Sequence, residues 1–202
     1  MLHINTYRIR VIIATLSLVT MSSAFIQTSF SQEPTSNSSL SASATPSQMK
    51  YETAKEQFLK VWDTLEFEPR VATFVNGSEV IGNGQYQEHS NVFAPGEDIV
   101  LYVQPIGFGH KQIQGQNGEK LYSMNFTADI VLSTTNGTII GGGQDIPISK
   151  LISNYRNTEL FATLTLTVPQ DASIKGDYIS KYTLKDQTTG KSFDITKDVT
   201  IS

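Results

Sequence analysis

The 202-residue chain contains no cysteine. This absence excludes a disulfide framework, a thiolate zinc site, a cysteine nucleophile and a lipid anchor on cysteine. Positive charge is scarce too, because 15 Lys and Arg residues stand against 19 Asp and Glu, a formal net charge of -4. Nucleic-acid binding needs clustered basic side chains, so this balance argues against a nucleic-acid partner.

Acidic residues are missing altogether from residues 1–31. Arg8 and Arg10 precede the apolar run 11–21, and the small residues 22–24 follow it, a pattern typical of a secretory signal peptide. The run is shorter than the roughly 20 residues that span a bilayer. The pattern predicts a signal over residues 1–31 and a secreted protein, either extracellular, periplasmic or in the cell envelope. An uncleaved signal would be the only membrane contact.

Residues 32–48 are rich in Ser, Thr and Pro and contain one large apolar residue, Leu40. Such a composition cannot bury enough apolar surface to offset its ordering entropy, which predicts a disordered segment. We interpret it as a tether that holds a domain away from a surface. A passive, variable terminus is the alternative.

An amphipathic helix is expected over residues 49–66, with Ser47 as its N-cap. Its apolar residues recur at helical spacing and form one stripe: Tyr51, Ala54, Phe58, Val61, Trp62 and Leu65. We expect this stripe to pack on a sheet and to bury the only tryptophan. The alternative is a helix that binds a partner.

Beyond Pro69 the apolar period changes to two. The clearest strand covers residues 122–132, where every second side chain is apolar, and similar patterns cover 160–168, 178–184 and 193–201. Further strands are expected at 71–75 and 99–103. Strands with one polar face are typical of antiparallel packing between two sheets. Residues 67–202 therefore predict a mainly β domain, an antiparallel immunoglobulin-like β-sandwich of about seven strands with one N-terminal helix.

Turn residues support this arrangement. Asn136-Gly137 lies between apolar runs and is a strong hairpin signal. Residues 141–143 are all glycine, which indicates a flexible strand end or a bulge. Lys197 interrupts the apolar face of the last strand and predicts a bulge or an open sheet edge there.

Residues for catalysis are few. His89 and His110 lie in loop-like sequence without an acidic cluster, whereas a zinc site normally needs three protein ligands. The carboxylate pairs Glu66 with Glu68 and Glu97 with Asp98 leave a glycosidase-like hydrolase as a minor alternative. No nucleophile elbow, zinc-protease motif or phosphate loop occurs. We therefore expect a protein that is not an enzyme and uses no cofactor or metal.

Four N-x-S/T sequons stand out as candidate glycosylation sites, because exported chains can carry glycans at such sites. Their acceptor residues are Asn37, Asn76, Asn125 and Asn136.

The stretch 93–103 reads FAPGEDIVLYV and is followed by Gly107-Phe108. Further along come a segment from Tyr155 to Phe161, a strand that ends in Val168-Pro169, a G-x-Y strand at 176–178 and D-x-x-T-G-K at 186–191. Together these motifs resemble an uncharacterised family of secreted or periplasmic prokaryotic β-sandwich proteins. The resemblance covers residues 70–202. It implies a sandwich fold and export, and it implies no activity.

Two long loops are expected, at residues 107–118 and 148–157. Binding residues concentrate on loops that a rigid scaffold holds, and aromatic residues with arginine carry much of the energy of interfaces. Phe108, His110, Tyr155 and Arg156 are thus the candidate binding residues, although Phe108 and Tyr155 could instead close the ends of the core. The sequence favours an exported, non-enzymatic binding or interaction module, its partner an unknown envelope protein or glycan. A carbohydrate-binding or enzyme-accessory module is the alternative.

Overall fold

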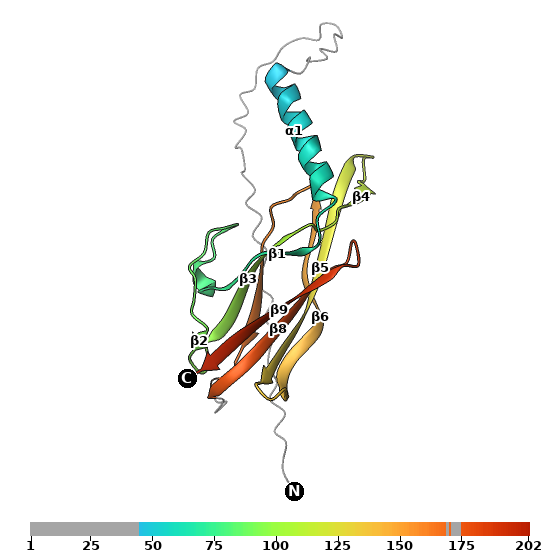
Figure 1. Ribbon diagram of the computed structural model, residues 1–202. Coiled ribbons are helices and arrows are strands. Elements are labelled where there is room, and N and C mark those ends of the chain that lie inside the picture. Colours follow the sequence, from blue (N-terminus) through green and yellow to red (C-terminus); the bar gives the residue numbers. More distant parts are fainter. Residues whose placement is uncertain (1–44, 169, 171–174) are drawn as a thin grey trace, which may run out of the picture. The chain divides into compact units, whose positions relative to one another are not determined.

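The computed structural model describes residues 45–168, 170 and 175–202. The predicted signal and most of the predicted tether lie outside these residues. The described chain divides into two compact units, one that contains the helix α1 and one that contains every strand from residue 65 onward. Figure 1 shows both units, which are described separately below.

Helix α1 runs from Pro46 to Trp62. Thr45 caps it, because its side chain accepts a hydrogen bond from the Gln48 amide while the Gln48 side chain accepts one from the Thr45 amide. This reciprocal capping box fixes the start of the helix three residues before the predicted one, so Ser47 as N-cap and a tether extending to residue 48 were wrong. The helix also ends earlier than predicted, at a cap on Asp63.

Only one residue of α1 is buried, and it is Trp62, as predicted. The Phe58 ring lies 6.0 Å from the Trp62 ring. Tyr51, Phe58 and Val61 remain exposed, so the expectation that the whole apolar stripe is buried was wrong.

The second unit is mainly β, with strands in two sheets (Figure 1). A three-stranded antiparallel sheet has the order β1-β3-β7, with bounds β1 (Glu68–Phe74), β3 (Asp98–Ile106) and β7 (Ala162–Thr167). A six-stranded sheet has the order β2-β9-β8-β5-β4, with β6 paired to β5. Its bounds are β2 (Val92–Phe93), β4 (Lys111–Gln114), β5 (Lys120–Thr134), β6 (Ile139–Ser153), β8 (Gly176–Asp186) and β9 (Ser192–Ile201). The β2–β9 pair is parallel, so this sheet is mixed rather than purely antiparallel.

Strand β5 confirms the period-two prediction. Met124, Phe126, Ala128, Ile130 and Leu132 are all buried, and the residues between them are half-buried. β5 pairs with β8 along one edge and with β6 along the other. Apolar contacts join the two sheets, since the Phe74 ring of β1 meets the Phe93 ring of β2 edge-on at 5.3 Å.

The described residues form nine strands rather than about seven, because two expected loops contain strands. Residues 111–114 of the first loop form β4, and residues 148–153 of the second belong to β6. The β5–β6 hairpin turns at Asn136-Gly137 as predicted, with Gly137 at φ 88°. Bulges interrupt the β5–β6 register, and a Cβ on Gly142 would meet the Ile130 carbonyl oxygen, so the glycine run permits close pairing.

At Lys197 no bulge occurs, because the β8–β9 register continues through Ser180 and Lys197 without a shift. β2 pairs with β9 only at Thr200 and Ile201. Of the two alternatives predicted at Lys197, a bulge or an open sheet edge, the structure shows the open edge.

Strand β3 is buried on both faces. Ile99, Leu101 and Val103 are fully buried on one face, and Val100, Tyr102 and Gln104 are buried on the other. The second face is covered by the connection between β1 and β2, residues 76–91, which we call the covering segment. Val80 and Tyr86 of this segment pack against the cluster of Val75, Val100, Tyr102 and Phe161. A short 3-10 helix, η1 (Gly77–Glu79), opens the segment.

Candidate functional site

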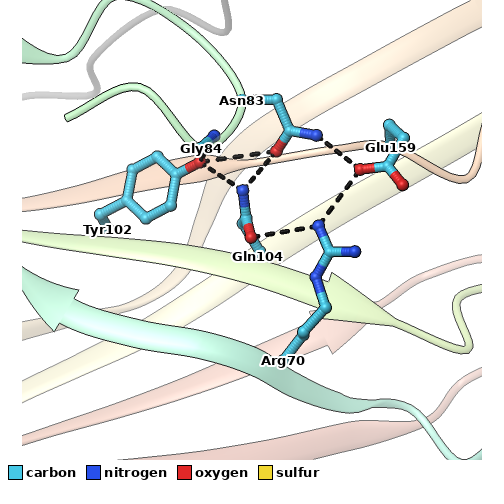
Figure 2. A network of polar contacts seen from close by, with 6 residues as sticks. All are labelled: Arg70, Asn83, Gly84, Tyr102, Gln104 and Glu159. Carbon is cyan, nitrogen blue, oxygen red and sulfur yellow. Dashed lines mark hydrogen bonds and ion pairs between the residues drawn. The ribbon is translucent and has the colours of Figure 1, made fainter.

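A polar network lies under and beside the covering segment (Figure 2). Its centre is the phenol of Tyr102, a residue of β3 that is 0% exposed. The phenol oxygen accepts hydrogen bonds from the Gly84 amide at 2.8 Å and from Nε2 of Gln104 at 2.7 Å. It also lies 3.5 Å from Oδ1 of Asn83, to which it donates. The network therefore holds the covering segment on the sheet.

Two further side chains, Arg70 and Glu159, extend the network to the surface. Gln104 donates from Nε2 to Oδ1 of Asn83 at 2.6 Å and accepts from Nη2 of Arg70 at 3.1 Å. Oε2 of Glu159 then accepts from Nδ2 of Asn83 at 2.6 Å and from Nη2 of Arg70 at 3.2 Å. The amide groups of Gln104 are thus satisfied although the residue is buried, as buried polar groups require.

Burial determines the electrostatics of this centre. Burial raises the pKa of Tyr102 above its ordinary value, and the hydrogen bonds from Gly84 and Gln104 offset this effect only in part. The phenol therefore stays neutral near neutral pH. On either side of it, the rings of Tyr86 and Phe161 lie within contact, with centroids at 4.4 and 5.3 Å.

The outer members of the network face water while their positions are fixed. The side chains of Arg70 and Glu159 are 47% and 58% exposed. In Figure 2 every contact of Arg70 starts from Nη2 and every contact of Glu159 from Oε2, so the other guanidinium nitrogens and the other carboxylate oxygen do not contact the residues drawn. A guanidinium, a carboxamide and a carboxylate are thus presented together on a buried support. We call Arg70, Asn83 and Glu159 the polar rim.

Sequence reasoning did not find the polar rim. Arg70 directly precedes the predicted strand 71–75, and Gln104 directly follows the predicted strand 99–103. A polar residue at the end of a fully apolar strand is the signal that could have identified Gln104. No local pattern connects these residues to Glu159, which is 89 positions from Arg70.

The predicted binding residues lie in two neighbouring loops. Nε2 of His110 lies 2.7 Å from the carbonyl oxygen of Asn157, which joins the loop after β3 to the loop after β6. Tyr155 is 68% exposed and Arg156 is half-buried. Phe108 is only 1% exposed, and its ring meets the Phe126 ring edge-on. Its assignment as a surface binding residue was therefore wrong, and it closes the core instead.

Asp186 anchors the same end of the domain. Its carboxylate is 0% exposed and accepts hydrogen bonds at 2.8 Å from the amides of Gly109 and Thr188 and from the hydroxyl of Thr189. The bonds to Thr188 and Thr189 form an Asx-type turn between β8 and β9. Asp186 thus holds the loop of His110 in place through Gly109.

The predicted carboxylate pairs have separate partners. Glu66 contacts Lys191 at 3.3 Å, and Asp98 accepts from the hydroxyl of Thr167 at 2.6 Å. Glu97 contacts Nε2 of His89 at 3.2 Å and accepts from the Ala94 amide at 2.7 Å. Each of these three carboxylates therefore has a contact that fixes a turn or a strand end.

Of the four sequons, Asn37 lies outside the described residues. Asn76 and Asn136 are exposed at turns, whereas Asn125 is half-buried in the middle of β5. The Asn136 side chain accepts from the Thr134 hydroxyl and the Thr138 amide.

In the part of the chain that the structure describes, no group of three or more His, Asp or Glu side chains could hold a metal ion. No helix among the described residues is long and apolar enough to cross a bilayer.

No family model and no curated protein matches this chain. Among solved structures, the chain is similar to a family 123 glycoside hydrolase from Clostridium perfringens, studied for the hydrolysis of glycolipid glycans. The match has a TM-score of 0.36 and 11% sequence identity, and it covers 55% of this chain and 22% of the hydrolase. A likeness at this level carries no argument about fold or function.

Proposed function

We propose that this protein is an exported, non-enzymatic immunoglobulin-like β-sandwich domain that binds an envelope glycan at the polar rim of Arg70, Asn83 and Glu159. The observation that carries the proposal is the fixed presentation of these three side chains on the buried Gln104 and Tyr102. The charged N-terminus, the apolar run and the small residues of the first 31 positions support export. The motifs of residues 93–191 support membership of the secreted prokaryotic β-sandwich family.

The chemistry of the rim suits a polyhydroxylated ligand. Each sugar hydroxyl can both donate and accept, so neighbouring hydroxyls can donate to a carboxylate and accept from a guanidinium. Because the contacts among Arg70, Asn83 and Glu159 already hold the side chains, little rotamer entropy is lost on binding. Tyr86 is half-buried beside the network and offers an apolar contact of the kind that supports sugar rings.

Binding can be measured with the full chain against a panel of purified polysaccharides that includes peptidoglycan, chitin and cellulose, with soluble oligosaccharides for titration. We expect Glu159→Gln to weaken binding about tenfold, since one strong contact is worth roughly that factor. Asp194→Asn is the matched control, because Asp194 is a similarly exposed carboxylate in β9, paired with Lys181. Failure to bind any of these glycans, or equal binding by both variants, would contradict the glycan proposal.

A protein partner at the His110 loop is the second candidate. The observation in its favour is the exposed ring of Tyr155 beside Arg156, on loops that the His110–Asn157 contact joins. Tyr155→Ala should then reduce capture of an envelope protein without affecting glycan binding.

The proposal that the protein is not an enzyme is tested by assaying the full chain for hydrolysis of glycosides and esters. Turnover that Glu97→Gln abolishes would overturn it.

A further inference from the structure

Four Asn-Gly dipeptides occur within the described residues, and all four lie outside the strands. They are Asn76-Gly77, Asn83-Gly84, Asn117-Gly118 and Asn136-Gly137. In such a dipeptide the glycine nitrogen can attack the asparagine side-chain carbonyl, because no Cβ on the glycine obstructs it. We propose that Asn76 is the site at which the folded protein deamidates, and that the Tyr102 network suppresses the same reaction at Asn83.

The reaction needs only water as a second reactant. A bond forms between the backbone nitrogen of Gly77 and Cγ of Asn76, and the bond from Cγ to Nδ2 breaks. The amide proton of Gly77 leaves with Nδ2 as ammonia, and a cyclic succinimide remains. Water then opens the ring at either carbonyl and yields aspartate or isoaspartate, without oxidation or reduction.

Asn76 has the fewest restraints on the reacting atoms. Among the described residues, the Gly77 amide has no hydrogen-bond partner, so the nucleophile is free. The side-chain oxygen Oδ1 of Asn76 accepts from the Ser78 hydroxyl at 2.9 Å and from the Ser78 amide at 3.4 Å. These donors polarise the carbonyl that is attacked. Turning the exposed carboxamide toward Gly77 breaks only contacts to one neighbouring residue.

At Asn83 both reacting groups are held. The Gly84 amide donates to the Tyr102 phenol at 2.8 Å, which ties up the nucleophile. Nδ2 of Asn83 donates to Glu159, and Oδ1 accepts from Gln104, each at 2.6 Å. The reaction would have to break all of these contacts. The buried phenol would then keep only its bond from Gln104, and Gln104 would lose its acceptor on Asn83.

The two remaining dipeptides lie between these extremes. The amides of Gly118 and Gly137 donate to Gly115 at 3.1 Å and to Thr134 at 2.9 Å, so their turns hold the nucleophile. Neither asparagine is joined to a buried network. We therefore expect intermediate rates at Asn117 and Asn136.

The location of Asn76 gives the reaction a structural consequence. Asn76 is the first residue of the covering segment and caps η1, and it is the acceptor of one sequon. Isoaspartate there inserts an extra methylene into the backbone where the segment leaves β1, and it removes the sequon. This inference does not depend on the glycan proposal, because it concerns the covering segment whatever the polar rim binds.

The test is incubation of the full chain at mildly alkaline pH, followed by peptide mapping that separates asparagine, aspartate and isoaspartate. In the folded protein we expect Asn76 to convert at least about tenfold faster than Asn83. The reason is that the reaction at Asn83 must first break several hydrogen bonds that have no counterpart at Asn76. In urea the four dipeptides should react at similar rates. Asn76→Gln should remove the fast-converting peptide and leave the other rates unchanged.

Tyr102→Phe supplies the second arm. Loss of the phenol should raise the conversion of Asn83 severalfold, while unchanged rates at Asn117 and Asn136 exclude general unfolding as the cause. The proposal is overturned if Asn83 reacts as fast as Asn76 in the folded protein. It is equally overturned if Asn117 or Asn136 reacts faster than Asn76.

Discussion

Two polar clusters on the β domain have similar chemistry and different surroundings. The Tyr102 network is built on a buried phenol and a buried amide under the covering segment. On the six-stranded sheet, Nζ of Lys185 in β8 lies 2.8 Å from both Asp129 of β5 and Asp145 of β6. That second cluster, which we call the carboxylate ladder, is partly open to solvent, because the side chains of Lys185, Asp129 and Asp145 are 27%, 23% and 74% exposed. Because the polar contacts in the two clusters have similar lengths, a difference in their contribution to stability reflects the difference in burial.

Burial decides what a lost contact costs. At the buried centre of the Tyr102 network, a polar atom that loses its hydrogen-bond partner cannot bond to water instead. The free-energy cost of removing that atom from water is then not compensated. In the carboxylate ladder, water replaces a lost partner, and exposed ion pairs contribute little for this reason. The following experiments test this difference, from the largest expected effect to the smallest.

Tyr102→Phe should have the largest effect. The substitution keeps the ring but removes the acceptor of the Gly84 amide and one of the two acceptors of Nε2 of Gln104, which still donates to Asn83. We expect the free energy of unfolding to fall by about 2 kcal/mol, because the two hydrogen bonds that the buried phenol accepts are lost at about 1 kcal/mol each. Urea unfolding followed by circular dichroism measures it. Tyr122, a half-buried tyrosine of β5, supplies the control variant Tyr122→Phe. If Tyr102→Phe lowers the free energy of unfolding no more than this control does, the Tyr102 phenol does not stabilise the fold.

Alkaline pH should break the Tyr102 network before it affects the ladder. Burial raises the pKa of Tyr102, Tyr178 and Tyr182 above 10.0. Between pH 10.0 and these raised values the unfolded chain loses protons that the folded chain keeps, so stability falls as the pH rises. We expect phenolate absorbance from these residues to appear only together with loss of structure. A titration in which all tyrosines ionise while the fold is retained would contradict this.

Glu159→Gln should have a smaller effect on stability than Tyr102→Phe, although both residues belong to one network. Glu159 is exposed, and glutamine can still accept from Asn83 through its side-chain oxygen. We expect the free energy of unfolding to change by less than about 1 kcal/mol. If this variant destabilises as strongly as Tyr102→Phe, the distinction between centre and rim is wrong.

Of the two clusters, acid pH should affect the carboxylate ladder, and this effect should be the smallest of the four. Burial alone would raise the pKa of Asp129, but the hydrogen bonds from the Lys185 ammonium and the Asp145 amide outweigh it and hold this pKa below 3.8. The contribution of this carboxylate to stability is therefore present above pH 3.8 and is lost as the pH falls through the lowered value. Lys185→Met should reduce this acid dependence slightly. An unchanged unfolding midpoint in both the parent and the variant down to pH 2 would contradict the assignment.

Local pattern predicted most of the sheet and little of the candidate site. The alternation in β5 fixed which face is buried, because every second residue from Met124 to Leu132 is apolar. β6 was missed over residues 148–153, since its glycine run and Pro147 resemble a loop. The period-two pattern of residues 160–168 places Phe161 on the same face as the alternating threonines, but its ring stacks beside Tyr102 under the covering segment. Such coverage depends on tertiary contacts, which no local period records.

The same limit applies to the polar rim. Arg70, Asn83 and Glu159 come from three separate parts of the chain, and each has an unremarkable local sequence. Their proximity follows from the pairing of β1 with β3 and from the course of the segments on either side. One sequence without its contact map cannot supply that information.

The long sequence separation in the network has a consequence for folding. The β5–β6 and β8–β9 hairpins join neighbouring stretches of chain, whereas β3 pairs with β7 across about sixty residues. Pairings between distant segments pay more loop-closure entropy and form slowly. We therefore expect the three-stranded sheet to assemble after the hairpins. A partly folded chain would then lack the polar rim entirely, so the proposed glycan binding would report that folding has reached completion.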